Sequence, residues 1–341
     1  MIAAVTEAVE TMRVRDVPEP DEPGEGEVIV RPAAVGICGS DFHFFEGRLS
    51  EHAGGSGFPR IQGHEVGGTI AAVGPGTSLQ EGQTVALYPL TACGHCYPCR
   101  IGRPNVCVNF SLIGVHEDGG LQEQLRIPAS QVFPVHVKST VVAALVEPVS
   151  IAVRAVHRAR IADGEHVVVF GAGPIGQSLL VAAQDKGASV MLVDPLEDRL
   201  ATARDLGAQA VQWTSAAEVI AAAREWAGGA PEVVIDATGV PAAVATGVEL
   251  VSSAGRMVQV GMSGDSIDLR IGSLTEKEID VLGVACCGSG EFGEAVDLVE
   301  RNADRLAQLV SHEFTLAEAP NALKFAMENP RDVMKVVIRG G

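Results

Sequence analysis

The sequence predicts an α/β protein in which a β-rich region is followed by a doubly wound parallel sheet. Up to about residue 149 the chain is rich in glycine, proline and short β-branched runs, which are typical of short strands and turns. From about residue 150, helical patterns rich in alanine and leucine alternate with compact apolar strands, as in a parallel sheet covered by helices. A glycine-rich turn, Gly171 to Gly176, joins one of these strands to the next helix and supports the same fold.

The composition indicates a globular, acidic chain of about two domains. The 341 residues are 47% hydrophobic, which is enough to bury a full core. No uncharged apolar run reaches about 18 residues, and the N-terminus lacks the basic segment and apolar core of a signal peptide, so we expect a cytoplasmic location. A net charge of -18 would repel phosphate backbones and anionic lipid, so we expect neither nucleic acid nor membrane as a partner.

The order of the expected elements suggests three segments. After the parallel strands, two helical patterns and a closing strand make up a tail that we expect to return to the first region. The expected domain boundaries are therefore 1–149, 150–288 and 289–341. The expected strands of the parallel sheet are residues 167–170, 190–193, 233–235, 257–260 and 281–285, and the tail holds helices at 291–300 and 317–328 and a strand at 335–339.

Four of the seven cysteines lie close together in the sequence. They follow the spacing CxxCxxCx7C and are Cys93, Cys96, Cys99 and Cys107. Thiolates at this spacing can surround one ion, and four of them complete the tetrahedral shell of a structural zinc site without an open position for substrate. A disulfide cluster is the alternative, but it is uncommon in the reducing compartment expected here. We predict a structural zinc in a lobe at about residues 88–110.

The glycine-rich turn predicts a dinucleotide site. The strand 167–170 runs into a GxGxxG motif that opens a helix, which is the order that the motif requires. The first glycine allows the tight turn, the second lets a pyrophosphate approach the backbone, and the third lets the helix pack on the strand. The candidate residues of this turn are Gly171, Gly173, Pro174, Ile175 and Gly176.

An acidic residue beyond this motif predicts NAD as the cofactor. Asp194 ends the next strand, 18 residues after Gly176, where a carboxylate accepts hydrogen bonds from the adenosine ribose and repels a 2′-phosphate. Arg199 follows five residues later and could cover the adenine or the ribose edge, so NAD is preferred over NADP without NADP being excluded. Gly239, Val260 and Gly261 lie at later strand ends, on the edge where such sheets bind ligands.

A second set of metal-ligand residues is scattered over a hundred positions. Cys38, His64, Glu65 and Glu147 are too far apart in sequence to form a local site, so the fold would have to assemble them. Three protein ligands with a fourth open position are typical of catalytic zinc, which can polarise an alcohol oxygen. Each residue alone is ambiguous, but the set together predicts a catalytic metal.

Taken together, these motifs resemble the zinc-containing medium-chain alcohol dehydrogenases over essentially the whole chain. The resemblance rests on Cys38, on the Gly63-His64-Glu65 motif, on the cysteine lobe and on the GxGxxG turn. It implies a GroES-like catalytic domain completed by the C-terminal tail, a Rossmann domain, and an active site in the cleft between them. It also implies a homotetramer or homodimer joined through the edge of the Rossmann sheet.

Within the family, the segment 38–43 and Glu147-Pro148 resemble the sorbitol, threonine and sugar-acid (galactonate-type) dehydrogenase branch. The resemblance implies that Cys38 and His64 bind zinc, with Glu65 or Glu147 as the third ligand. It implies that Ser40 contacts the reacting hydroxyl and that His43 is the outer base of the proton relay. The expected cofactors are NAD and two zinc ions per chain.

The branch resemblance suggests a polar secondary alcohol, namely a polyol, sugar or sugar acid, as the substrate. The loop 113–120 resembles that of galactonate-type enzymes and offers His116 and Glu117 as partners for hydroxyl or carboxylate groups. Sorbitol-type enzymes carry an arginine near residues 285–288 that is missing here, so Arg48 or Arg60 would have to replace it. The alternatives are a dehydrogenase of threonine or a simple alkanol, and a binding protein of the same fold that has lost activity.

Overall fold

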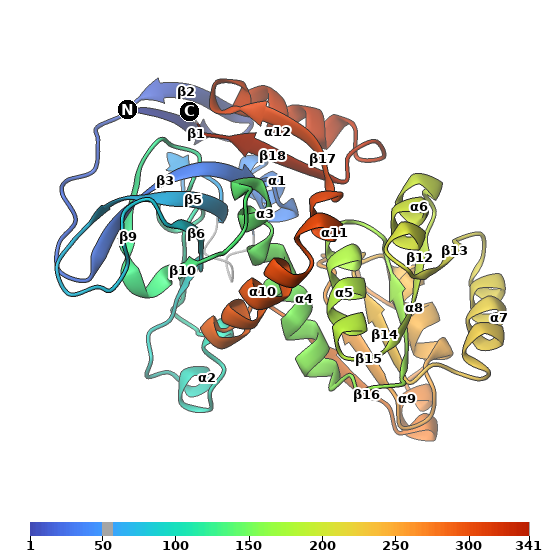
Figure 1. Cartoon of the computed structure of the whole chain (residues 1–341). Coiled ribbons are helices and arrows are strands. Elements are labelled where there is room, and N and C mark those ends of the chain that lie inside the picture. The colour runs from blue at the N-terminus through green and yellow to red at the C-terminus, as the bar shows by residue number, and fades with distance from the viewer. Residues whose placement is uncertain (50–56, 341) are drawn as a thin grey trace. The chain divides into compact units, whose positions relative to one another are not determined.

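The computed structural model describes residues 1–49 and 57–340, and the chain divides into two compact units (Figure 1). The first unit comprises Met1–Glu147 and Gly288–Gly341, and the second comprises Pro148–Cys287. The C-terminal tail therefore folds with the N-terminal region and not with the segment that precedes it. In the part of the chain that the structure describes, no helix has the length and apolar character required to span a membrane.

The main sheet of the first unit brings the two ends of the chain together. Its strand order is β10-β6-β5-β3-β18-β17, and β9 also pairs with β3. Strand β18, near the C-terminus, lies antiparallel to β3, with Val337 opposite Gly36. The bounds are β3 Glu27–Gly36, β5 Glu65–Val73, β6 Thr84–Leu87, β9 Leu125–Pro128, β10 Val132–Pro134, β17 Val310–Thr315 and β18 Lys335–Arg339.

Smaller elements surround this sheet. Strands β1 Ile2–Ala8, β2 Thr11–Asp16 and β4 Arg60–Ile61 form a three-stranded sheet, and β7 Leu90–Thr91 pairs with β8 Ser111–Leu112 at the base of the cysteine lobe. Apolar side chains of α12, among them Ala322 and Leu323, close the core on these strands. The helices of the unit are α1 Gly39–Phe45, α2 Tyr97–Arg100, α3 Thr140–Ala144, α10 Ser289–Arg301, α11 Ala303–Ala307 and α12 Ala319–Glu328, with short 3₁₀ turns η2 Pro104–Val106, η3 Ala129–Gln131 and η4 Leu316–Glu318.

The second unit is a six-stranded parallel sheet of the order β13-β12-β11-β14-β15-β16. This order is that of a doubly wound nucleotide-binding sheet. All its strands are parallel, but the chain adds strands toward one edge from β11 to β13 and toward the other edge from β14 to β16. Its strands are β11 His166–Phe170, β12 Ser189–Asp194, β13 Gln209–Gln212, β14 Val233–Asp236, β15 Arg256–Gln259 and β16 Asp280–Gly283. Its helices are α4 Val146–Ala159, which begins at the unit boundary, α5 Pro174–Asp185, α6 Glu197–Asp205, α7 Ala216–Ala227, α8 Pro241–Leu250 and α9 Gly272–Lys277.

Alternation along the strands explains why helices cover both faces of this sheet. Val168 and Phe170 point to one face, where they pack with apolar residues of α7 and α8, while Val167 and Val169 point to the other face and are equally buried. Strand β13 was not predicted from the sequence, because Gln209 and Gln212 at its ends are polar and exposed. Strands β15 and β16 also end one and two residues earlier than predicted.

Candidate active site

The four cysteines of the lobe converge on one point. The sulfurs of Cys93, Cys96, Cys99 and Cys107, which we call the four-cysteine cluster, all lie within 4.8 Å of one another. The Cys96 sulfur is 3.4 Å from that of Cys99 and 3.7 Å from that of Cys107. Four thiol sulfurs in this arrangement match the closed donor set of tetrahedral zinc.

Backbone amide groups near the four-cysteine cluster stabilise a thiolate. Amide groups of His95 and Cys96 lower the pKa of Cys93 to about 6. Burial, together with neighbouring thiols, raises the pKa of Cys99 to about 12. Thiolates are the form that binds a metal, so a divalent cation at this cluster would displace the protons that remain on the thiols.

Strand pairing brings Cys38 and His64 to the same place. Gly36, the last residue of β3, pairs with Glu65, the first residue of β5. Cys38 lies two residues beyond this pair on one strand, and His64 lies one residue before it on the other. Both side chains therefore lie at the same end of the sheet. Ligand atoms of Cys38, His64 and Glu65 fall within 4.8 Å of one another, and we call this set the Cys38–His64–Glu65 cluster.

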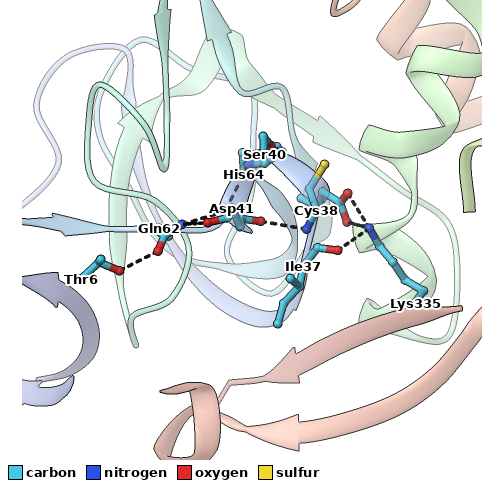
Figure 2. A network of polar contacts seen from close by, with 9 residues as sticks. Thr6, Ile37, Cys38, Ser40, Asp41, Gln62, His64 and Lys335 are labelled. Carbon is cyan, nitrogen blue, oxygen red and sulfur yellow. Dashed lines mark hydrogen bonds and ion pairs between the residues drawn. The ribbon is translucent and has the colours of Figure 1, made fainter. Parts of the chain in front are cut away.

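A buried carboxylate, Asp41, connects two members of this cluster (Figure 2). Its Oδ2 accepts a hydrogen bond of 2.9 Å from the Cys38 backbone nitrogen, and its Oδ1 lies 3.8 Å from His64 Nδ1. Burial opposes a charge on the imidazole, but Asp41, Cys38 and Glu147 raise the pKa of His64 well above its usual range in the metal-free protein. A carboxylate that faces one ring nitrogen leaves the other, Nε2, for a metal.

Glu65 is paired with a lysine from the C-terminal strand. Lys335 Nζ lies 2.6 Å from Glu65 Oε1 and 2.5 Å from Oε2, and it donates to the Ile37 carbonyl at 2.9 Å. Lys335 is at this position because β18 pairs with β3, and both side chains are almost fully buried. A side chain at Gly36 would place its Cβ 1.9 Å from Glu65 Oε2, so the ion pair requires glycine there.

Glu147 is the other carboxylate candidate for the metal. It lies in the first turn of α4 and is 9% exposed. Burial raises the pKa of Glu147 to about 7, while His64 lowers it and Glu65 raises it, so Glu147 interacts electrostatically with the cluster. The cluster of ligand atoms within 4.8 Å includes Glu65 and not Glu147.

The proposed relay residues lie on the short helix that Cys38 begins. Ser40 Oγ is 3.4 Å from His64 Nε2, so its hydroxyl lies beside the nitrogen that faces the metal position. His43 is three residues further along α1, on the same face as Ser40, and is half-buried. Among the described residues no hydrogen bond links Ser40 directly to His43.

The turn of the second unit has the form that a dinucleotide requires. Gly171 has a φ of 95°, and a Cβ at Gly176 would lie 1.8 Å from the Gly171 carbonyl oxygen. A Cβ at Gly173 would come no closer than 3.7 Å to any other residue, and its nearest neighbour would be Arg199 Nη1. The surface at Gly173 is therefore open to a ligand, as close approach of a pyrophosphate demands.

Asp194 is linked to this turn by hydrogen bonds. Its Oδ2 accepts from the Ala172 nitrogen at 2.8 Å, and its Oδ1 accepts from the Leu196 nitrogen at 2.8 Å. Arg199 Nη1 lies 3.9 Å from the same carboxylate. A carboxylate has about four acceptor positions, so Asp194 retains capacity for ribose hydroxyls.

A second carboxylate, Asp236, organises the next two strand ends. It accepts hydrogen bonds from the backbone nitrogens of Thr238 and Gly239 and from the side chain of Gln259. Gly239 has a φ of 73°, and a Cβ at Gly261 would lie 2.2 Å from the Gly239 nitrogen. The predicted residues Gly239, Val260 and Gly261 therefore form one close-packed edge.

Comparison with known families identifies the chain. Residues 24–137 match the model of the alcohol dehydrogenase GroES-like domain, and residues 174–301 match the model of the zinc-binding dehydrogenase domain. A relative from Escherichia coli K12, L-galactonate-5-dehydrogenase, is 33% identical over 321 residues, which cover 93% of this chain and 92% of the relative. The chain belongs to the zinc-type alcohol dehydrogenases. The predicted family and fold class are therefore confirmed.

Solved structures of zinc-type alcohol dehydrogenases show the same fold with either cofactor. An alcohol dehydrogenase from Escherichia coli in complex with NADH has a TM-score of 0.88 and 30% identity, covering 99% of both chains. A zinc-binding dehydrogenase from Sinorhizobium meliloti bound to NADP has a TM-score of 0.89 and 28% identity, covering 99% of this chain and 98% of that one. The dehydrogenase is thus a zinc- and nicotinamide-dependent oxidoreductase, as predicted.

The two predicted substrate residues, His116 and Glu117, form hydrogen bonds with other residues of their own loop. His116 Nδ1 accepts a hydrogen bond from the Leu112 nitrogen at 3.1 Å, and its ring packs edge-on against Phe110. Burial and the nearby Arg60 lower the pKa of His116. Glu117 bonds to the Ser111 hydroxyl. The loop itself lies near the metal cluster, because Gly114 and Gly119 pack directly on the backbone of Gly63.

The two arginines suggested as a substrate clamp are paired with carboxylates. Arg48 forms an ion pair with Glu46, and Arg60 lies 3.1 Å from Asp118. Arg60 Nε, however, has no hydrogen-bond partner among the described residues.

Several residues that support the site were not found from the sequence. Asp41 had a weak signal, because an acidic residue three positions after a helix cap is typical of a capping box. Lys335 and Gln62 had none, since each is a single polar residue whose partners are distant in sequence. Asp236 was also missed, although it ends a strand and its partners Thr238 and Gly239 follow directly in the sequence.

Proposed function

We propose that the dehydrogenase oxidises a polar secondary alcohol, such as a polyol, sugar or sugar acid, to the ketone and transfers the hydride to NAD. The observation that carries this proposal is the Cys38–His64–Glu65 cluster, with its ligand atoms within 4.8 Å, in a zinc-type alcohol dehydrogenase. The sugar-acid activity named for the Escherichia coli relative supports the class of substrate.

We propose the following roles for the residues of the site. A zinc ion held by Cys38 and His64, with Glu65 or Glu147 as a further ligand, would act as a Lewis acid on the alcohol oxygen, and NAD would accept the hydride. Ser40, whose hydroxyl lies 3.4 Å from His64 Nε2, would accept a hydrogen bond from the substrate hydroxyl and would release its own proton as it takes up that of the substrate. His43 would pass that proton to solvent. We propose that the four-cysteine cluster holds a second, structural zinc.

A spectrophotometric screen tests this function. Polyols, aldonates, amino alcohols and simple secondary alcohols are each offered with NAD, and the formation of NADH is followed. We expect the highest kcat/KM with a polyol or an aldonate, and we expect two zinc ions per chain by elemental analysis. Higher kcat/KM values with threonine or simple alkanols would overturn the substrate class, and a protein with two zinc ions but no turnover on any alcohol would overturn the enzymatic role.

We propose that NAD is preferred over NADP because of Asp194. Its carboxylate is 4% exposed and fixed by two backbone nitrogens, so it would remain close to a 2′-phosphate. Repulsion in such a site would disfavour NADP by roughly 2 to 4 kcal/mol. Asp194→Asn keeps the shape and removes the charge. The ratio of kcat/KM with NAD to kcat/KM with NADP should therefore fall by a factor of at least about ten. Equal use of both cofactors by the unmodified enzyme would contradict the preference.

We propose that the enzyme is a cytoplasmic homodimer or homotetramer joined through β16. This strand is at the end of the sheet, and Val281 on it is 52% exposed. Met262 and Ile271, in the segment before it, are 72% and 74% exposed. An open strand edge beside exposed apolar side chains suits pairing with a second copy about a twofold axis. Val281→Lys should shift the sedimentation coefficient toward a monomer, and an unchanged oligomer would contradict this interface.

A further inference from the structure

Gln62 is a fully buried polar residue directly before the Gly63-His64 pair. Its side chain is 0% exposed, as is that of its partner Thr6. Its Nε2 donates to the Asp41 carbonyl oxygen at 3.0 Å and lies 3.4 Å from Asp41 Oδ1, while its Oε1 accepts from the Thr6 hydroxyl at 2.6 Å. Both neighbours of Nε2 are acceptors, so the orientation of the amide is determined by its contacts.

Asp41, which Gln62 holds, is the carboxylate that reaches the metal ligands. Figure 2 shows the chain of contacts from Thr6 through Gln62 to Asp41, and from Asp41 to Cys38 and His64. His64 Nδ1 has no hydrogen-bond partner among the described residues, and the Asp41 oxygen at 3.8 Å is the acceptor that faces it. Small movements of Asp41 therefore decide whether this nitrogen is paired and how the ring is oriented.

We propose that Gln62 is a positioning residue of the zinc site, which holds the Asp41 carboxylate so that His64 presents Nε2 to the metal. Thr6 in turn fixes the amide of Gln62. This inference rests on the proposed function in one respect only, namely that Cys38 and His64 bind zinc. Groups that orient a metal-ligating histidine typically contribute about 10- to 100-fold to metal affinity, and we expect an effect of this size for Gln62.

The substitution Gln62→Met tests the proposal, because methionine fills a similar volume and cannot donate or accept these hydrogen bonds. Gln131→Met is the matched control. Gln131 is also buried, at 7% exposure, and its Nε2 donates to the Tyr88 carbonyl at 3.0 Å in the same unit. A general loss of stability would affect both variants, whereas a loss of metal affinity would affect only the first.

A second pair of variants tests the far end of the contact chain. Thr6→Val removes the hydroxyl that Gln62 accepts from and keeps the shape, and we expect zinc affinity to fall about fivefold. Thr6→Ser restores a hydroxyl and should return the affinity to that of the unmodified enzyme. These milder changes keep the proposal testable if Gln62→Met does not fold.

The measurement is the rate at which each purified holoenzyme releases its zinc ions to a chromogenic chelator, together with the visible spectrum of the cobalt-substituted enzyme. We expect Gln62→Met to release one of two zinc ions about 10- to 100-fold faster, with an altered cobalt–thiolate spectrum. Release rates and spectra equal to those of Gln131→Met would overturn the inference. If the unmodified enzyme held only the four-cysteine zinc, the proposed function itself would fail, which is a distinct result.

Discussion

The four-cysteine cluster and the Cys38–His64–Glu65 cluster use similar ligand atoms but are built in different ways. The first is contained within fifteen residues, Cys93 to Cys107, and its sulfurs contact mainly one another and nearby backbone nitrogens. The second combines ligands from the ends of two strands with a buried lysine from near the C-terminus and a glutamate on α4. The first cluster therefore depends on one short segment, whereas the second depends on residues that the fold brings together from distant parts of the sequence, which fits the structural and catalytic roles that we propose for them.

The largest expected effect concerns the assembled cluster. Cys38→Ser should lower kcat/KM by about 10²- to 10⁴-fold, because a Lewis acid contributes several kcal/mol to the transition state. The enzyme should keep one zinc ion per chain and most of its thermal stability. Steady-state kinetics, elemental analysis and a thermal melt check this result, and a variant with nearly normal turnover would remove Cys38 from the metal site.

The reciprocal change concerns the four-cysteine cluster. Cys99→Ser should also leave one zinc ion per chain, but its main effect should be a loss of more than about 4 kcal/mol of stability or a changed oligomer, since losing a structural metal is among the most destabilising changes. The molecules that remain folded should keep kcat/KM within about threefold. Urea denaturation and sedimentation measure the effect. A stable variant with a purely catalytic defect would reverse the comparison.

A third prediction concerns the buried ion pair between Lys335 and Glu65, which links the assembled cluster to the C-terminal strand. Lys335→Met leaves Glu65 charged and unpaired, which should cost about 3 to 5 kcal/mol in the free energy of unfolding. The double variant Lys335→Met/Glu65→Gln should recover much of this loss, because the uncompensated charge is gone. Lys324→Met, at an exposed position on α12, is the control. A loss below about 1 kcal/mol in the single variant would show that the pair is not required.

The smallest expected effect is a pH dependence of the metal-free protein. Burial raises the pKa of Glu147 from 4.5 to about 7. Between these values the folded state binds more protons than the unfolded chain, so stability should fall as pH rises from about 4.5 to about 7, by up to about 3 kcal/mol. Glu147→Gln should remove much of this dependence and leave the contribution of Asp41, whose pKa burial also raises, whereas Glu328→Gln, at an exposed position, should keep the full dependence. Urea midpoints of chelator-treated protein across this pH range decide the outcome.

The sequence by itself determined the features that depend on short spacings. The CxxCxxCx7C run and the strand–GxGxxG–helix order each carry their chemistry within one segment, so the lobe and the dinucleotide turn could be predicted before the fold was known. Cys38 and His64 were predicted as part of a scattered set of metal-ligand residues, and the family resemblance supported them as zinc ligands. The polar, exposed strand β13 was missed, because its ends lack the apolar pattern of a buried strand.

Only the tertiary structure decided which distant groups surround the assembled cluster. Lys335 reaches Glu65 because β18 pairs with β3, a contact across 270 residues of sequence. Thr6 meets Gln62 because β1 pairs with β4 beside the His64 turn, and Gln62 in turn donates to Asp41. The physical reason is that a buried charge or amide must be paired, but the sequence does not record which partner the fold will bring to it.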